Sequence, residues 1–239
     1  MIPARYESSR LPGKALLSLA GKPMIQWVFE GAARAQSIEK VIVATDDQRI
    51  IDAVEAFGCQ AVMTSPNHPS GTDRVAEAVG DGRPDVIINL QGDEPRIDPA
   101  AIDQLTALFE DPHPPRMATL CHPLSSEEAR DPSKVKVVFD EHFNALYFSR
   151  EPIPHCRDGE LGEHYLHVGI YAYTPDALRE FVSLPPGRLE RLEKLEQLRA
   201  LENGIPIRVA ITSYRSFGVD TPEDAERMDR LLRDTHRHL

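Results

Sequence analysis

The 239-residue chain has few cysteines, fewer basic than acidic residues and no long apolar run. Its three cysteines are widely spaced and form no C-x-x-C pair, so we expect reduced thiols and no disulfide framework. Lys and Arg total 27 against 38 Asp and Glu, and the net charge of −11 disfavours nucleic acid and anionic membranes as partners. No apolar stretch approaches the ~18 residues of a membrane span, and no signal peptide is expected. These absences predict a cytoplasmic protein.

The apolar residues that are present alternate between two spacings. The composition is 41% hydrophobic and 27% charged, which is typical of a folded domain rather than a disordered chain. Up to residue 121, short β-branched runs alternate with segments of helical spacing, and this pattern predicts βαβ units with a mostly parallel sheet. The expected strands are 40–45, 60–64, 85–90 and 117–121, and the expected helices are 46–58, 72–79 and 99–110.

The pattern changes after about residue 124. Two apolar runs predict a hairpin, and a further strand is expected after them. The pattern then predicts a helix, a strand and a C-terminal helix that begins at Pro222. The hairpin strands are 135–139 and 145–149, the further strand is 168–173, the helix is 189–202 and the last strand is 207–211. Thr221 is a suitable cap for the C-terminal helix. We expect one α/β domain over residues 1–239, with a small β-rich insertion near 124–173.

Residues 3–14 (PARYESSRLPGK) form a basic segment in an otherwise acidic chain. They match neither the P-loop nor the G-x-G-x-x-G pattern. Arg5, Arg10 and Lys14 nevertheless supply positive charge, the serines supply donors, and Gly13 permits close backbone approach. The segment is therefore either an anion cradle or a solvated basic loop. Only two residues precede it, fewer than a complete first strand would use.

Two aspartates are candidates for metal binding. Asp93 follows the apolar run 85–90, at the edge where open α/β sheets bind ligands, and Asp220 precedes the C-terminal helix. Carboxylates from distant segments suit Mg²⁺, which takes one or two of them together with phosphate oxygens and waters. The alternatives are a turn residue for Asp93 and a helix cap for Asp220. The histidines around Cys156 match no zinc spacing, so no zinc site is expected.

Motifs spread in order over nearly the whole chain resemble those of one family. Besides residues 3–14 they are GKPMI (21–25), VATD (43–46), SGTDR (70–74), NLQGDEP (89–95), ALYFSR (145–150), HVGIY (167–171), LEQLR (195–199) and GVDTPED (218–224). Together they resemble the 3-deoxy-D-manno-octulosonate (Kdo) cytidylyltransferases, a family of CTP-dependent sugar nucleotidyltransferases. The resemblance implies a three-layer, Rossmann-like nucleotidyltransferase fold with a mostly parallel central sheet, Mg²⁺ as cofactor, and CTP and Kdo as substrates. It also implies a homodimer, with its contact in the β-rich insertion.

The functional positions of that family fall on matching residues of this chain. Those implied in catalysis are Arg10, Lys14, Asp93 and Asp220, the two aspartates being the Mg²⁺ ligands. Those implied in CTP binding are Ala4, Arg5, Ser9, Arg10, Lys14, Ser70, Gly71, Thr72, Arg74 and Gln91. Those implied in Kdo binding are Arg150, His167, Glu196 and Gln197. Without the resemblance, Ser70 is an ordinary helix cap, and Glu196 and Gln197 form the polar face of an amphipathic helix.

The implied reaction is attack by the anomeric hydroxyl of Kdo on the α-phosphorus of CTP, which releases pyrophosphate and gives CMP-Kdo for lipopolysaccharide synthesis. One alternative is a cytidylyltransferase for another acid sugar, such as amino-Kdo or sialic acid. Another is a non-catalytic nucleotide-binding regulator on the same fold.

Overall fold

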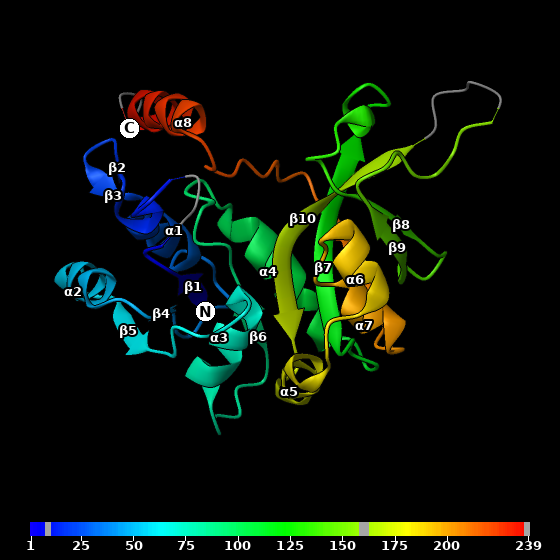
Figure 1. The fold of residues 1–239 in the computed structure, drawn as a ribbon, viewed down its shortest axis with the longest axis horizontal. Helices are drawn as coiled ribbons and strands as arrows, with labels where there is room; N and C mark the ends of the chain where they lie inside the picture. The colour runs from blue at the N-terminus through cyan, green and yellow to red at the C-terminus, as the bar shows by residue number, and fades with distance from the viewer. Residues whose placement is uncertain (8–10, 158–162, 237–239) are drawn as a thin grey trace. The chain divides into compact units, whose positions relative to one another are not determined.

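The computed structural model describes residues 1–7, 11–157 and 163–236. The chain divides into two compact units, and Figure 1 labels the elements of both. Unit 1 comprises Met1–Gly82, Asn89–Asp103 and Ser216–Leu239, and unit 2 comprises Arg83–Ile88 and Gln104–Arg215. A single domain with an insertion at 124–173 stays a prediction. Within the described residues no helix combines the length and the hydropathy needed to cross a bilayer.

Unit 1 is built on a parallel three-stranded sheet in the order β1-β4-β5. Its strands are β1 (Ile2–Ala4), β4 (Ile42–Thr45) and β5 (Gln60–Met63). The short β1 is well placed because it pairs with β4 along its whole length, from Ile2 opposite Val43 to Ala4 opposite Thr45. The amide of Leu90 also donates to the carbonyl oxygen of Met1 at 3.0 Å.

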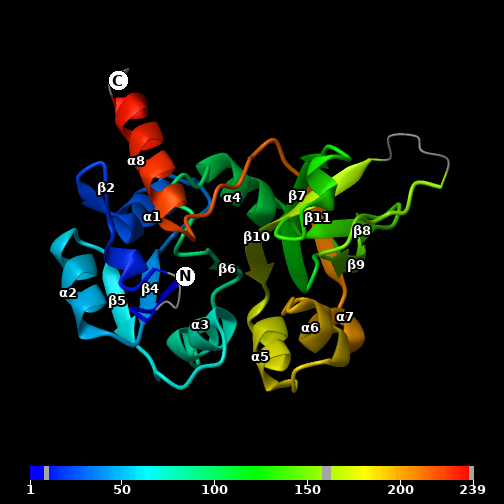
Figure 2. The same ribbon diagram turned by 45° about the horizontal axis from the view of Figure 1, so that its top comes forward.

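The helices of unit 1 follow the expected alternation. They are α1 (Met24–Ala32), α2 (Gln48–Ala56), α3 (Gly71–Val79) and α8 (Pro222–His236), preceded by the turn η1 (Lys14–Leu16) and the hairpin β2 (Ser18–Leu19) and β3 (Lys22–Pro23). Figure 2 shows α8 alongside α1 and β2, where Met228 and Leu232 share an apolar cluster with Trp27 and Leu19. The Thr221 hydroxyl accepts from the Asp224 amide at 3.2 Å, so the expected cap is confirmed.

Unit 2 contains a six-stranded sheet in the order β11-β7-β10-β8-β9, with β6 pairing β10. Its strands are β6 (Ile87–Asn89), β7 (Met117–Leu124), β8 (Lys136–Phe139), β9 (Ala145–Ser149), β10 (His164–Tyr173) and β11 (Ile207–Ile211). The pair β7–β11 is parallel, whereas β10 is antiparallel to β7 and β8, and β8 to β9. The expected hairpin is confirmed as β8 and β9. Strands β7 and β10 are longer than expected because they pair from Met117–Tyr173 to Leu124–His164.

The expected helix at 189–202 is wrong. The segment forms α6 (Arg188–Glu193) and α7 (Leu198–Glu202), and Lys194 between them has the left-handed backbone angles φ 55° and ψ 45°. The regular apolar stripe of the sequence is broken at this bend, since Leu192 is 69% exposed while Leu195 is 6% exposed. Tertiary contacts outweigh the helix propensity of the segment here.

The remaining helices are α4 (Pro99–Ala107), α5 (Pro175–Ser183) and the short turns η2 (Leu108–Glu110) and η3 (Glu128–Arg130). Segment 99–110 is therefore helical as expected, with a tighter last turn. The other expected strands and helices are present, with ends that differ by up to two residues.

Candidate functional site

A pocket of about 920 Å³ lies in unit 1 at the carboxyl end of β1. It brings together basic side chains, two aspartates and the N-terminus of α3. Its lining residues are Pro3, Ala4, Arg5, Tyr6, Glu7, Pro12, Lys14, Ala15, Met24, Arg49, His68, Ser70, Gly71, Arg74, Gln91, Gly92, Asp93 and Asp220. Open α/β sheets bind their ligands at this edge, and the volume suits a nucleotide.

Two glycines let the walls of this pocket approach β1. A Cβ on Gly92 would lie 3.0 Å from the carbonyl oxygen of Pro3, and a Cβ on Gly71 would lie 3.2 Å from the Cγ of the same proline. A larger residue at Gly92 would press β1 away from the segment that carries Asp93, and one at Gly71 would press it away from the start of α3. Gly71, which the family resemblance implies in CTP binding, therefore also has a packing role.

Lys14 bridges the two predicted metal ligands. Its Nζ donates to Asp93 Oδ2 at 2.6 Å and to Asp220 Oδ1 at 3.0 Å. The preceding Gly13 has a φ of 69°, and its amide donates to the Tyr6 carbonyl at 2.9 Å, which turns the chain so that Lys14 enters the pocket. The amide of Val219 donates to the carbonyl of Asp93 at 2.9 Å, so the two aspartate segments are joined by backbone as well.

The aspartate pair fits a Mg²⁺ site. Among the described residues no group of three or more His, Cys, Asp or Glu side chains converges on one point. Mg²⁺ needs no such group, because it is held by one or two carboxylates together with substrate phosphates and waters. Oxygens of Asp93 and Asp220 both lie within hydrogen-bond distance of one nitrogen, so they are close enough to face a common cation.

Asp220 is held in place by Asp224 on α8. One oxygen of the Asp224 carboxylate accepts from the amides of Asp220 and Thr221 at 3.2 and 3.0 Å and from the Thr221 hydroxyl at 3.0 Å. Burial acts to raise the pKa of Asp224, but the hydrogen bonds from Thr221 and Asp220 outweigh it and the pKa lies below its ordinary value. Asp224 is therefore an ionised acceptor that fixes the segment before α8.

The N-terminus of α3 forms another wall of the pocket. The Ser70 hydroxyl caps the helix by accepting from the amides of Thr72 and Asp73 at 3.1 and 3.2 Å. The Thr72 hydroxyl accepts from Asn89 Nδ2 at 3.3 Å, and Thr72 is buried and does not line the pocket. Ser70 therefore caps the helix and also lines the pocket, and its role in CTP binding stays a prediction.

Arg74 is largely committed to its protein partners. Its Nη1 donates to Thr64 Oγ1 at 2.6 Å and its Nη2 to Asp46 Oδ2 at 2.7 Å. The side chains of Arg74 and Asp46 are 5% and 16% exposed. Arg74 therefore joins α3 to the segments that follow β4 and β5, and it reaches the pocket as part of that wall.

Most residues implied in CTP binding thus line one pocket, but not all of them. Ser9 and Arg10 lie outside the described residues, as does Ser8. The sequence did not point to Arg49, whose guanidinium carbon lies 3.3 Å from the centre of the Tyr6 ring and which also pairs with Asp47. Its place in the first turn after β4, at the ligand-binding edge, was the signal that could have identified it.

The residues implied in Kdo binding all lie in unit 2. His167 on β10 contacts Thr119 Oγ1 through Nε2 at 3.1 Å, and its ring lies against Phe148 and Tyr171. Burial lowers the pKa of His167 to about 3, so the ring is neutral. Thr119 Oγ1 lies 3.0 and 2.8 Å from the carbonyl oxygens of Val168 and Ile170, which can only accept, so its one proton is used there.

The tautomer of His167 follows from these contacts. Since Thr119 has no second proton, His167 Nε2 must donate to it, and Nδ1 keeps the lone pair. A neutral histidine in this state offers a hydrogen-bond acceptor to a ligand hydroxyl. Tyr171, which the sequence did not single out, lies beside the ring, and burial raises its pKa well above the ordinary value.

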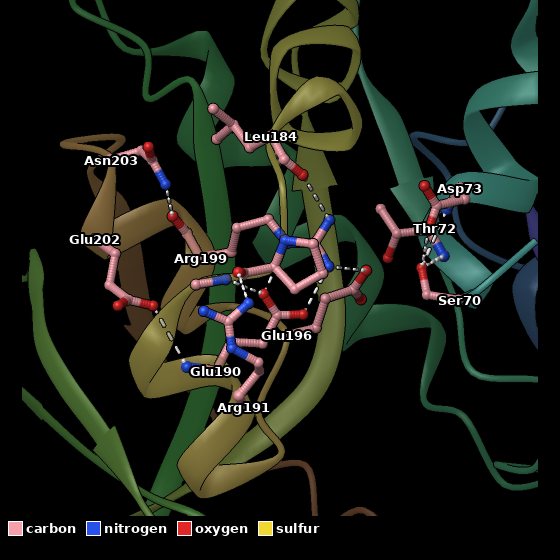
Figure 3. A network of polar contacts seen from close by, with 12 residues as sticks. Ser70, Thr72, Asp73, Leu184, Glu190, Arg191, Glu196, Arg199, Glu202 and Asn203 are labelled. Atoms are coloured by element: carbon pink, nitrogen blue, oxygen red, sulfur yellow. Dashed lines mark hydrogen bonds and ion pairs between the residues drawn. The ribbon is translucent and has the colours of Figure 1, made fainter.

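Glu196 and Gln197 lie in the bend between α6 and α7, not on one continuous helix as expected. Figure 3 shows Glu196 beside Arg199, and the Glu196 carboxylate lies 4.0 Å from the Arg199 guanidinium. Gln197 is buried in this bend, with 6% of its surface exposed. Arg150 follows β9, and its guanidinium donates to carbonyls of the same bend.

A parallel sheet edge that combines basic side chains with a carboxylate pair is typical of a nucleotidyltransferase. The chain belongs to the cytidylyltransferase family, whose sequence model matches residues 1–210. The expected α/β nucleotidyltransferase fold and the expected enzyme class are thereby confirmed.

Relatives of similar length carry two substrate names. The 3-deoxy-manno-octulosonate cytidylyltransferase of Nitratidesulfovibrio vulgaris (strain Hildenborough) is 52% identical, with 98% of this chain and 95% of the relative covered. The 8-amino-3,8-dideoxy-manno-octulosonate cytidylyltransferase of Shewanella loihica is 56% identical, with 94% of each chain covered.

Two solved structures are similar to the chain, one in both sequence and fold and the other in fold alone. The chain is similar to a CMP:2-keto-3-deoxy-manno-octonic acid synthetase complexed with CTP, at a TM-score of 0.94 and 48% identity, covering 98% of this chain and 97% of the other. A putative glucose-1-phosphate thymidylyltransferase from Bacillus anthracis shares the fold at a TM-score of 0.66 and 18% identity, covering 98% and 94% of the two chains.

Proposed function

We propose that this chain transfers CMP from CTP to the anomeric hydroxyl of Kdo and releases pyrophosphate. The observation that carries the proposal is the contact of Lys14 with both Asp93 and Asp220 inside a nucleotide-sized pocket. The solved relative complexed with CTP and the relatives named for Kdo support the choice of nucleotide and acceptor.

The nucleotide is held by the unit 1 pocket in this proposal. Lys14 and Arg5, together with Arg10, neutralise the triphosphate, since phosphoryl transfer depends on positioning and charge more than on covalent help. Short polar groups and backbone at the sheet edge read the base and ribose. These are Ala4, Ser70, Gly71, Arg74 and Gln91, of which Arg74 also holds the wall, while buried Thr72 supports that wall; the family resemblance adds Ser9.

Asp93 and Asp220 hold Mg²⁺ in the proposal, and Asp224 keeps Asp220 in place. When bound, Mg²⁺ offsets negative charge on the phosphate that reacts. Because Lys14 donates to both carboxylates, it can pass from them to the phosphates without leaving the pocket. The anomeric oxygen of the sugar forms the new bond to the α-phosphorus and gives up its proton to water, and the bond from that phosphorus to pyrophosphate breaks.

The acceptor is held by unit 2 residues. Arg150 binds the sugar carboxylate, neutral His167 accepts from a hydroxyl through Nδ1, and Glu196 and Gln197 bind further hydroxyls. The product is an activated Kdo for lipopolysaccharide synthesis. A cytoplasmic location and a homodimer that meets through residues 124–173 are part of the same proposal.

The test is pyrophosphate release measured with a panel of nucleotides and acceptors. We expect release from CTP with Kdo and Mg²⁺, and little release with other nucleotides, with sialic acid, or after chelation of the metal. 8-Amino-Kdo is the critical competitor because relatives named for it are equally similar. Asp93→Asn and Asp220→Asn should abolish release, while Asp52→Asn on the exposed face of α2 should not. No release from CTP and Kdo would refute the proposal.

A further inference from the structure

Reciprocal hydrogen bonds between side chain and backbone join the end of α6 to the end of β9. Glu193 is the last residue of α6, and Arg150 directly follows β9. The Glu193 side chain contacts the backbone at Arg150, and the Arg150 side chain contacts the backbone at Glu193. Glu193 precedes Glu196 and Gln197 in the same bend, and the proposed function places both of these against the acceptor sugar.

The Glu193 carboxylate fixes the end of β9. Its Oε1 accepts from the Ser149 hydroxyl at 2.7 Å and its Oε2 from the Arg150 amide at 2.9 Å. Burial, followed by the nearby Glu193 carboxylate, also raises the pKa of Tyr147. Tyr147, Ser149 and Arg150 therefore all interact with this one carboxylate.

The Arg150 guanidinium binds backbone carbonyls in the bend between α6 and α7. Its Nε donates to the Glu193 carbonyl at 2.8 Å and its Nη2 to the Lys194 carbonyl at 3.4 Å, while Nη1 donates to the Pro132 carbonyl at 3.0 Å. The first two are carbonyls at the end of α6, where no later helical amide is available. They account for the abrupt turn at Lys194.

These contacts leave Arg150 able to bind a ligand. A guanidinium has five N–H donors, and one hydrogen on Nη1 and one on Nη2 remain after the three carbonyl contacts. A pair of donors on neighbouring nitrogens matches a carboxylate. The contacts with Glu193 and Lys194 thus set the direction in which this pair is offered.

A second ion pair stabilises the bend independently. Glu190 on α6 accepts from Arg199 on α7 through both oxygens, at 2.8 and 2.6 Å, and Figure 3 shows this fork within unit 2. The two side chains are 13% and 6% exposed. Since Glu190 and Arg199 keep α6 and α7 together, loss of Glu193 should loosen Arg150 without unfolding the bend.

We propose that Glu193 is a positioning residue for the acceptor sugar, which acts by orienting the Arg150 guanidinium toward the sugar carboxylate. The proposal rests on the proposed function, because it needs Arg150 to contact that carboxylate. Glu193 itself touches no substrate. Its loss changes acceptor affinity and leaves nucleotide affinity as it was.

The test compares Glu193→Ala, Glu193→Gln and Arg150→Ala in steady-state assays of pyrophosphate release. We expect Glu193→Ala to raise the KM for Kdo about tenfold or more and to change the KM for CTP less than twofold. Glu193→Gln should recover most of the acceptor affinity, because its amide oxygen still accepts from the Arg150 amide and its nitrogen can donate to Ser149. Glu180→Ala, which removes an exposed partner of Arg116, is the matched control and should change neither KM.

A double-mutant cycle separates positioning from general loosening. If Glu193 acts through Arg150, the Arg150→Ala/Glu193→Ala variant should have the same KM for Kdo as Arg150→Ala alone. If the two substitutions raise the KM for Kdo additively, this inference is overturned and the proposed function is not. An active Glu193→Ala variant with an unchanged KM for Kdo would have the same consequence. Absence of product from the unmodified protein would overturn the proposed function and this inference with it. If Glu193→Ala does not fold, Ser149→Ala removes one of the two donors and should raise the same KM by a smaller factor.

Discussion

Replacing Arg74 by Met should destabilise the wall of the nucleotide pocket. Arg74 is buried, and its guanidinium joins Thr64 Oγ1 and Asp46 Oδ2 at 2.6 and 2.7 Å. Met keeps much of the volume but leaves the Asp46 carboxylate, 16% exposed, without its cation. An unpaired buried charge is the costly outcome of such a change, at about 3–5 kcal/mol.

The expected loss can be read as a melting temperature. For a chain of this size, a loss of about 3 kcal/mol lowers Tm by about 6–12 °C. The double variant Arg74→Met/Asp46→Asn removes the unpaired charge as well and should recover most of that loss. Calorimetry on the single variants, the double variant and the unmodified protein measures all four corners of the cycle.

The same proteins test whether Arg74 also contacts the nucleotide. We expect the double variant to regain Tm but to keep a raised Kd for CTP, because the implied contact is still missing. A Tm within about 2 °C of the unmodified protein for Arg74→Met would refute the reasoning about the buried pair. Recovery of both Tm and CTP affinity in the double variant would show that Arg74 acts only through the wall.

Two other changes test the two units separately. Lys14→Met should lower kcat/KM for CTP about 100-fold or more, since it removes a charge aimed at the phosphates. The control Lys134→Met, which breaks an exposed pair with Glu128, should leave kcat/KM unchanged. Equal activity of the two variants would count against the role of Lys14. The pKa of His167 lies near 3, below its ordinary 6.5, so the stability that the neutral ring contributes is complete above pH 6.5 and is lost as the pH falls toward 3. His167→Gln should therefore lose less Tm between pH 7 and pH 5 than the unmodified protein, and parallel melting curves would contradict this.

Much of the nucleotide pocket follows from local sequence. Gly13 and Lys14 lie in one short segment whose turn needs a left-handed residue, and Asp93 follows an apolar strand directly. Such features depend on neighbours in the chain, so period and spacing are enough to predict them. That Lys14 and Asp220, 206 residues apart, belong to one site needed the family resemblance.

The parts that were predicted incorrectly, or were not predicted, depend on distant contacts. The Leu periodicity of 189–202 predicts one helix, but Arg150 binds the Lys194 carbonyl from 44 positions away and the chain bends there. Lys136 is fully buried although strands rarely enclose a lysine, and its ammonium donates to the carbonyls of Asp131 and Arg150. Backbone carbonyls are present at every residue, so no sequence pattern marks these partners.

The most direct test of the account is identification of the product formed from CTP and Kdo. The protein is incubated with both and Mg²⁺, and the phosphorus species are followed by NMR. The account predicts equal amounts of pyrophosphate and a CMP–sugar phosphodiester, with neither formed when Kdo is omitted or when Asp93 is replaced by Asn. Formation of free CMP, or of pyrophosphate without the acceptor, would contradict it.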